Sequence, residues 1–168
     1  LEALCILKES LPKAVADGAA AETRAKVLWA SMLAGLALHN CNTHMGHNIS
    51  HALGSLVRVH HGLVTGLALE ATLPWLTARD AGSDLYAAAA KALGGPAQAQ
   101  ALPEALAALM RACGVERALP AECAGVKATD LAALMKAPAN IGMLEYQLKK
   151  KKDEMAELML DLPVLAAP

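Results

Sequence analysis

The residues best suited to chemistry are the six histidines, all of which lie within residues 39–61. Three of them, His47, His51 and His61, form a His-x3-His-x9-His pattern that ends in His-Gly. Histidines four residues apart share one face of a helix, and a third at the start of the next helix can reach the same point. Because neutral imidazole binds Zn, Fe and Cu, the pattern favours a metal or acid–base site over packed structural histidines.

The composition predicts that the elements holding these histidines are helices. Apolar residues make up 55% of the 168-residue chain, much of this fraction being Ala and Leu, whereas aromatic residues make up 2%. Ala and Leu are strong helix formers, and the β-branched and aromatic residues that favour strands are sparse. We therefore expect an all-α fold, a multi-helix bundle.

The histidines are expected on two successive helices, over 43–56 and 61–73. Thr43 is the expected N-cap of the first, because its hydroxyl can accept from the first free backbone N–H groups. Pro74 is expected near the end of the second. Further helices are predicted at 1–15, 20–38, 80–93, 102–113, 130–136 (capped by Thr129 and stopped by Pro138) and 145–160.

The helix over 20–38 has an apolar side that we expect to be buried. Its members are Val27, Leu28, Met32, Leu33, Leu36 and Ala37. Glu22, Arg24 and Lys26 mark the opposite, solvated side. The spacing is that of an amphipathic helix that packs on a core.

Charge and cysteine usage exclude several classes of function. The net charge is -1, so no nucleic acid or anionic membrane surface is expected as a partner. The longest apolar run, 27–38, is shorter than the roughly 18 residues of a membrane span. The four cysteines form no Cys-x2-Cys pair, which is typical of reduced thiols, and we expect a cytoplasmic protein.

The histidines are part of a longer pattern within residues 34–76, which consists of Ala34-Gly35, Asn40, His47, His51, Leu53-Gly54, His61-Gly62 and Leu73-Pro74. This pattern resembles the signature region of the iron-containing alcohol dehydrogenases. The flanks are similar too, at Leu11-Pro12, Asp17-Gly18 and Cys113-Gly114-Val115. The resemblance covers most of residues 1–140.

The resemblance implies a fold, a reaction and a role for three histidines. In that family an N-terminal Rossmann-like domain holds NAD or NADP, and an all-helical C-terminal domain holds Fe or Zn through an Asp and three His. By this resemblance His47 and His61 would be metal ligands. His51 would lie beside the metal on the substrate and nicotinamide side, as the catalytic residue. The metal would act as a Lewis acid on the oxygen of an alcohol or carbonyl substrate.

The chain departs from the family pattern in ways that limit the expected activity. The family's Asp-x3-His ligand pair and its Gly-rich dinucleotide segments would precede the region that matches Leu1. We therefore expect a single helical domain over 1–168, without the N-terminal nucleotide-binding domain and with no cofactor-binding residues of its own. Such a chain would bind Fe2+ or Zn2+ weakly and would be inactive alone.

Two alternatives remain open. In one, His44, which stands where relatives usually have glycine, joins the other histidines in a stand-alone metal-binding module. In the other, the chain is a structural remnant that self-associates through an exposed apolar flank. For the main hypothesis the expected partners are a small alcohol or aldehyde in the complete enzyme and a second copy of the chain.

Overall fold

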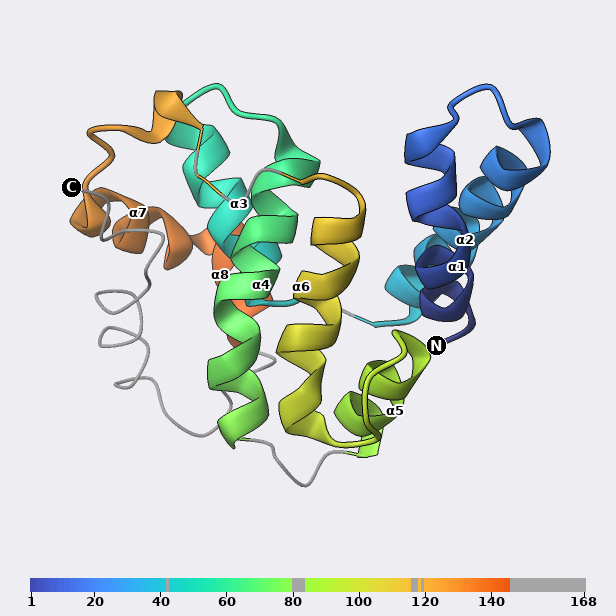
Figure 1. Ribbon diagram of the computed structural model, residues 1–168. Helices are drawn as coiled ribbons and strands as arrows, with labels where there is room; N and C mark the ends of the chain where they lie inside the picture. The colour runs from blue at the N-terminus through green and yellow to red at the C-terminus, as the bar shows by residue number, and fades with distance from the viewer. Residues whose placement is uncertain (42, 80–83, 116–117, 119, 146–168) are drawn as a thin grey trace. The chain divides into compact units, whose positions relative to one another are not determined.

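The computed structural model describes residues 1–145 except 42, 80–83, 116–117 and 119 (Figure 1). In this part of the chain all regular structure is helical, which confirms the predicted all-α fold. Two single turns of 3-10 helix, Ala99–Ala101 and Ala121–Cys123, accompany the α-helices. The α-helices are α1 (Glu2–Ala16), α2 (Ala21–Asn40), α3 (Met45–Leu56), α4 (His61–Arg79), α5 (Asp84–Ala92), α6 (Leu102–Ala112), α7 (Ala128–Met135) and α8 (Pro138–Glu145).

The helices form two compact units, which are described separately. The first unit comprises Leu1–Cys41 and Leu73–Glu116, and the second comprises Asn42–Thr72 and Arg117–Pro168. Helix α4 contributes residues to both. No helix in the described ranges is long and apolar enough to span a membrane.

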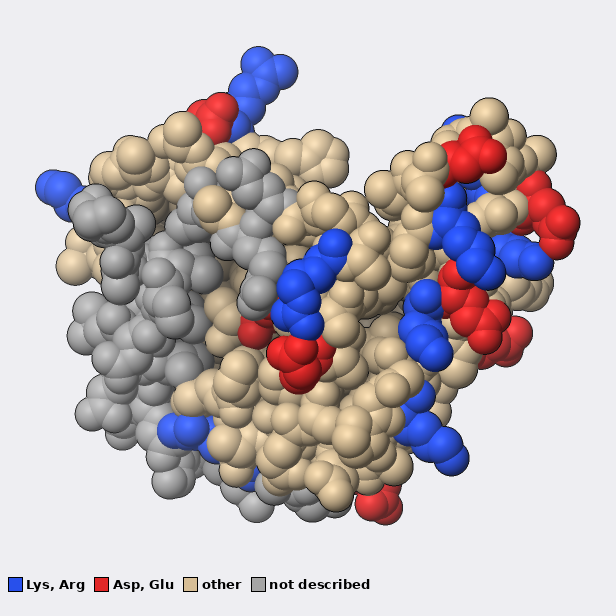
Figure 2. Space-filling view, viewed as in Figure 1, with Lys and Arg blue, Asp and Glu red and all other residues tan. Residues whose placement is uncertain are grey.

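In the first unit α1 packs against α2, and a local turn joins them. Asp17 Oδ1 accepts from the backbone N–H of Ala19 at 2.9 Å, and Arg24 donates to the carbonyl of Gly18 at 3.0 Å. On α2, Lys26 and Glu22 form an i,i+4 ion pair at 2.8 Å. Basic and acidic side chains alternate over this helix pair, which is a solvated surface (Figure 2).

The buried side predicted for α2 is wrong in part. Leu28, Met32 and Leu36 are exposed, with relative accessibilities of 72%, 45% and 56%. The shielded residues of α2 are Thr23, Val27, Ala30 and Leu33, of which Val27 and Leu33 belong to the predicted side. Their spacing of four, three and three residues is that of one helix face, the side that α1 covers. Which apolar stripe is buried thus depends on the position of α1.

In the second unit α3 is the buried helix, and it packs against α7 and α8. A fully buried amide joins the three helices. The Nδ2 group of Asn48 donates to the carbonyl of Met135 at 3.0 Å and to the carbonyl of Asn140 at 2.8 Å. Because buried polar groups are costly without partners, these two bonds fix α3 against the ends of both other helices.

Two prolines have positions in the helices that differ from those predicted. Helix α4 continues through Pro74 to Arg79, and the flanking residues Leu73 and Leu76 are buried. Proline removes one backbone hydrogen bond, and burial of the adjacent turns offsets that cost. Pro138 starts α8 and does not merely end α7, since the first helical position needs no backbone N–H.

Two predicted N-caps are also wrong. Helix α3 is capped by His44 and not by Thr43, and α7 begins after Lys127 without a side-chain cap, so Thr129 does not cap it. The predicted start of α6 at Leu102 is confirmed. The helix predicted over 145–160 lies almost entirely outside the described residues.

Candidate metal centre

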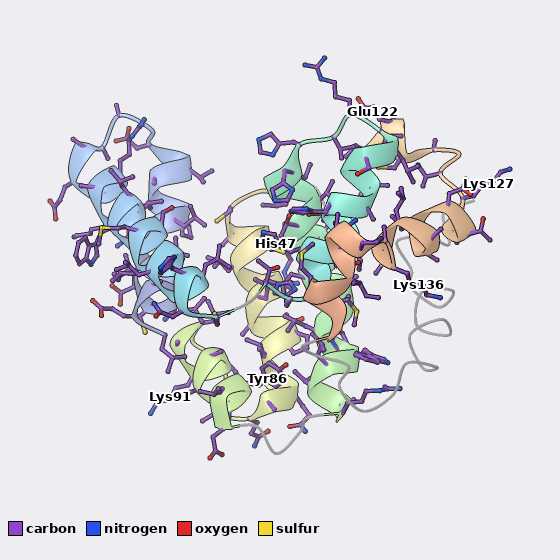
Figure 3. All side chains as sticks on the ribbon, turned by 180° about the vertical axis from the view of Figure 1, so that it is seen from behind. His47, Tyr86, Lys91, Glu122, Lys127 and Lys136 are labelled. Carbon is purple, nitrogen blue, oxygen red and sulfur yellow. The ribbon has the colours of Figure 1, made fainter. Side chains whose placement is uncertain are left out.

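The three histidines singled out by their spacing come together in the second unit. His47 and His51 lie on α3, and His61 is the first residue of α4 (Figure 3 labels His47). The ring centroids of His47 and His61 are 5.3 Å apart, as are those of His51 and His61. The rings of His47 and His51 are 6.0 Å apart. The i,i+4 spacing on one helix and the start of the next therefore produce one cluster.

The ring separations suit two imidazoles that share one metal ion. Imidazoles bound to a tetrahedral ion at about 2.1 Å have centroids about 5 Å apart. The 5.3 Å pairs of His47 with His61 and of His51 with His61 both agree with this value. Distance alone does not choose between the two pairs.

The cluster stands at the surface and has a neutral member at physiological pH. His51 and His61 are exposed, and His47 is half-buried. Burial, and then the charges of His61 and His51, lower the pKa of His47 below its ordinary value. A lowered pKa favours the neutral ring, which is the form that binds a metal ion.

His44 has a structural role that His47, His51 and His61 do not have. Its Nδ1 accepts from the backbone N–H of Gly46 at 2.7 Å, so the imidazole caps the N-terminus of α3. Its ring is 6.0 Å from that of His47. Burial, and then the charge of His47, lower the pKa of His44 to about 4. The capping bond occupies one ring nitrogen and leaves only Nε2 for any other role.

The two remaining histidines, His39 and His60, lie outside α3 and α4. His39 lies in the last turn of α2, in the first unit. His60 precedes α4, and its Nδ1 accepts from the backbone N–H of Leu63 at 3.4 Å, which is a long capping contact. Among the residues that the structure describes, no group of three or more His, Cys, Asp or Glu side chains could hold a metal ion by itself.

Two hydroxyl residues beside the cluster were missed from the sequence. Ser50 Oγ lies 3.2 Å from Nδ1 of His61, and Thr65 Oγ1 donates to Ser50 Oγ at 2.8 Å. Ser50 is three residues after His47, and Thr65 is four residues after His61. Helical spacing could therefore have placed Ser50 near His47 and Thr65 near His61, but not Ser50 beside the ring of His61.

Comparison with known proteins agrees with this fold. The model of the Fe-containing alcohol dehydrogenase family, C-terminal, matches residues 1–162. The alcohol dehydrogenase from Oenococcus oeni has a similar fold over 96% of this chain and 43% of its own, with a TM-score of 0.73. At 22% identity this likeness shows the fold alone.

Two curated relatives are more similar in sequence over shorter segments. A 63-residue segment is 36% identical to the NAD-dependent methanol dehydrogenase of Bacillus methanolicus, covering 38% of this chain and 16% of that protein. An 84-residue segment is 36% identical to the 1-propanol dehydrogenase PduQ of Salmonella typhimurium, covering 50% of this chain and 23% of that protein. The matched segments thus span less than a quarter of either relative.

Proposed function

The chain belongs to the Fe-containing alcohol dehydrogenase family, as its C-terminal domain, and from this premise we propose that it carries the metal-binding part of an NAD(P)-dependent enzyme. The complete enzyme interconverts a small alcohol and an aldehyde or ketone. His47 and His61 hold Fe2+ or Zn2+, and His51 lies beside them as the catalytic residue. The convergence of these three rings from α3 and α4 is the observation that carries the proposal.

The metal, when bound, supplies a Lewis acid for the substrate oxygen. The chain's own residues have separate tasks. His47, with its lowered pKa, offers a neutral imidazole at physiological pH. His51 is exposed next to His61, so a ring nitrogen of His51 is accessible to take up a proton from the substrate hydroxyl.

Two imidazoles are an incomplete ligand set for such an ion. Structural and catalytic sites for Zn2+ have at least three protein ligands. We propose that the other ligands and the nicotinamide cofactor are supplied from outside residues 1–168. The isolated chain is then expected to bind metal weakly and to show no NAD(P)H-linked turnover of short alcohols.

Cobalt substitution tests the assignment of the ligands. Co2+ titrated into the chain is expected to give a d–d absorption band, and His47→Ala and His61→Ala should each weaken binding at least about tenfold. His51→Ala should leave the affinity within about threefold. The matched control is His39→Ala, which removes an exposed imidazole from α2. Strong loss of binding in His51→Ala with none in His47→Ala would contradict the assignment.

The stand-alone metal module is tested with the same assay. His44→Asn keeps an acceptor for the N–H of Gly46 and removes the imidazole. We expect this variant to bind Co2+ as the wild type does. A stoichiometric metal that is lost in His44→Asn would favour the module of four imidazoles. Clear turnover of alcohols by the chain alone would overturn the proposal of an incomplete site.

A further inference from the structure

Ser50 is a buried hydroxyl between the two proposed ligands. Its accessibility is 2%, and its Oγ donates to the backbone carbonyl of His47 at 3.2 Å. The same oxygen lies 3.2 Å from Nδ1 of His61 and receives a hydrogen bond from Thr65 Oγ1 at 2.8 Å. One oxygen thus contacts the main chain of one proposed ligand and the ring of the other.

The hydrogen-bond partners of Ser50 determine which ring nitrogen of His61 carries the proton. A serine hydroxyl has one proton and two acceptor lone pairs. The carbonyl of His47 can only accept, so it takes the proton of Ser50. Thr65 Oγ1 lies 2.8 Å from Ser50 Oγ and also 2.8 Å from the carbonyl of His61, which likewise can only accept, so neither hydroxyl has a proton left for the ring of His61. A lone pair of Ser50 is then open to a donor, and the group that faces it is Nδ1 of His61.

We propose that Ser50 is a positioning residue that holds His61 in the Nδ1–H tautomer and so leaves Nε2, which lies 3.5 Å from Thr65 Oγ1, unprotonated as the metal-binding nitrogen. The role of Ser50 rests on the proposed function of His61 as a ligand. A histidine ligand needs a partner at its other nitrogen to fix its tautomer and its ring orientation. A buried hydroxyl that is itself held by two further bonds is a well-fixed partner.

Another serine of α3 shows what an ordinary helical hydroxyl does. Ser55 is exposed, and its Oγ donates to the carbonyl of His51 at 2.9 Å, the usual i−4 bond of a helix. Ser50 also bonds to a carbonyl of its own helix, but it contacts a histidine ring as well. Ser55→Ala is therefore the matched control for Ser50→Ala.

Nitrogen NMR of the metal-free, 15N-labelled chain tests the tautomer directly. Long-range 1H–15N spectra distinguish a protonated Nδ1 from a protonated Nε2, and His61→Asn assigns the signals of this ring. We expect the wild type to carry its proton on Nδ1. Ser50→Ala should raise the population of the Nε2–H tautomer several-fold, and Ser55→Ala should leave it unchanged.

Two results would overturn the proposal: a wild-type His61 with its proton on Nε2, or an unchanged tautomer in Ser50→Ala. The wild-type spectrum decides the first point even if Ser50→Ala fails to fold, which circular dichroism would reveal. In folded Ser50→Ala the affinity for Co2+ should fall about tenfold. A wild-type chain that binds no Co2+ contradicts the proposed function, whereas the tautomer measured without metal tests Ser50 separately.

Discussion

Helices α2 and α3 follow each other in the chain and are used in opposite ways. Of the 20 residues of α2 only Ala30 is buried, and its large apolar side chains Leu28 and Trp29 are exposed. Of the 12 residues of α3 seven are buried, among them the polar residues Asn48 and Ser50. The comparison teaches that apolar content does not identify the helix at the centre of a unit.

The polar bonds of the two helices differ in reach. On α2 they are local: Asn40 donates to the carbonyl of Leu36 four residues earlier, and Lys26 pairs with Glu22. On α3, Asn48 bonds to carbonyls 87 and 92 residues further along the chain. A buried polar group with distant partners is therefore the mark of the helix that carries the candidate metal centre.

The largest expected effect separates Asn48 from Asn40. Asn48→Ala removes two buried hydrogen bonds and leaves the carbonyls of Met135 and Asn140 without this partner. The free energy of unfolding should fall by roughly 2–4 kcal/mol. Asn40→Ala removes one exposed bond and should cost less than about 0.5 kcal/mol. Urea unfolding measures both, and equal losses would remove the contrast between the helices.

The next largest effect on stability concerns the N-termini of the two helices. A side chain caps the N-terminus of α3, whereas none caps that of α2. His44 has an ordinary pKa of 6.5 when unfolded and of about 4 when folded, so the unfolded chain binds its proton first. In metal-free protein the contribution of His44 to the free energy of unfolding is then fully present above pH 6.5 and is lost as the pH falls towards 4. At 1.36 kcal/mol per pKa unit the loss approaches about 3 kcal/mol.

His44→Asn isolates the contribution of this imidazole. The amide keeps an acceptor at the N-cap and has no proton to gain, so most of the slope between pH 6.5 and 4 should disappear. A smaller slope of the same sign should remain, because the pKa of His47 is lowered as well. Chemical unfolding at a series of pH values with a chelator present measures both. An unchanged slope in the variant would contradict the cap.

Replacing a glycine by alanine should destabilise α3 but stabilise α2. A Cβ at Gly46 would lie 2.5 Å from Cε1 of His44 and 3.0 Å from the backbone nitrogen of Leu69, so Gly46→Ala should cost about 1–3 kcal/mol. A Cβ at Gly35 meets nothing within 4 Å, so Gly35→Ala should stabilise α2 by about 0.5–1 kcal/mol. Thermal unfolding of both variants tests the pair. Stabilisation by Gly46→Ala would show that α3 does not approach α4 so closely.

The smallest effect on stability is expected on the exposed side of α2. Leu28→Gln should change the unfolding free energy by less than about 0.5 kcal/mol, because the side chain is already exposed. If the chain self-associates through this side, Leu28→Gln combined with Met32→Gln should weaken the association. Sedimentation velocity over a range of concentrations measures it. A wild type that stays monomeric at high concentration would contradict the expected association.

Most of the helices and the three clustered histidines could be predicted because their signals are local. Ala and Leu content and the His-x3-His spacing act within a few residues of the chain. Thr43 and Pro74 were misassigned, since the sequence does not show that the His44 ring would cap α3 or that packing would carry α4 past a proline. The roles of Ser50 and Thr65 were missed because both depend on the packing of α3 against α4.

By itself the sequence determined that the chain is helical, that it resembles one family, and that His47, His51 and His61 can converge. Only the tertiary structure decided which face of α2 is shielded, that Asn48 joins α3 to α7 and α8, and that Ser50 faces the ring of His61. The physical reason is the distance along the chain over which each interaction acts. Helix propensity and i,i+4 geometry are set by neighbouring residues, whereas burial and polar pairing are set by segments that meet only on folding.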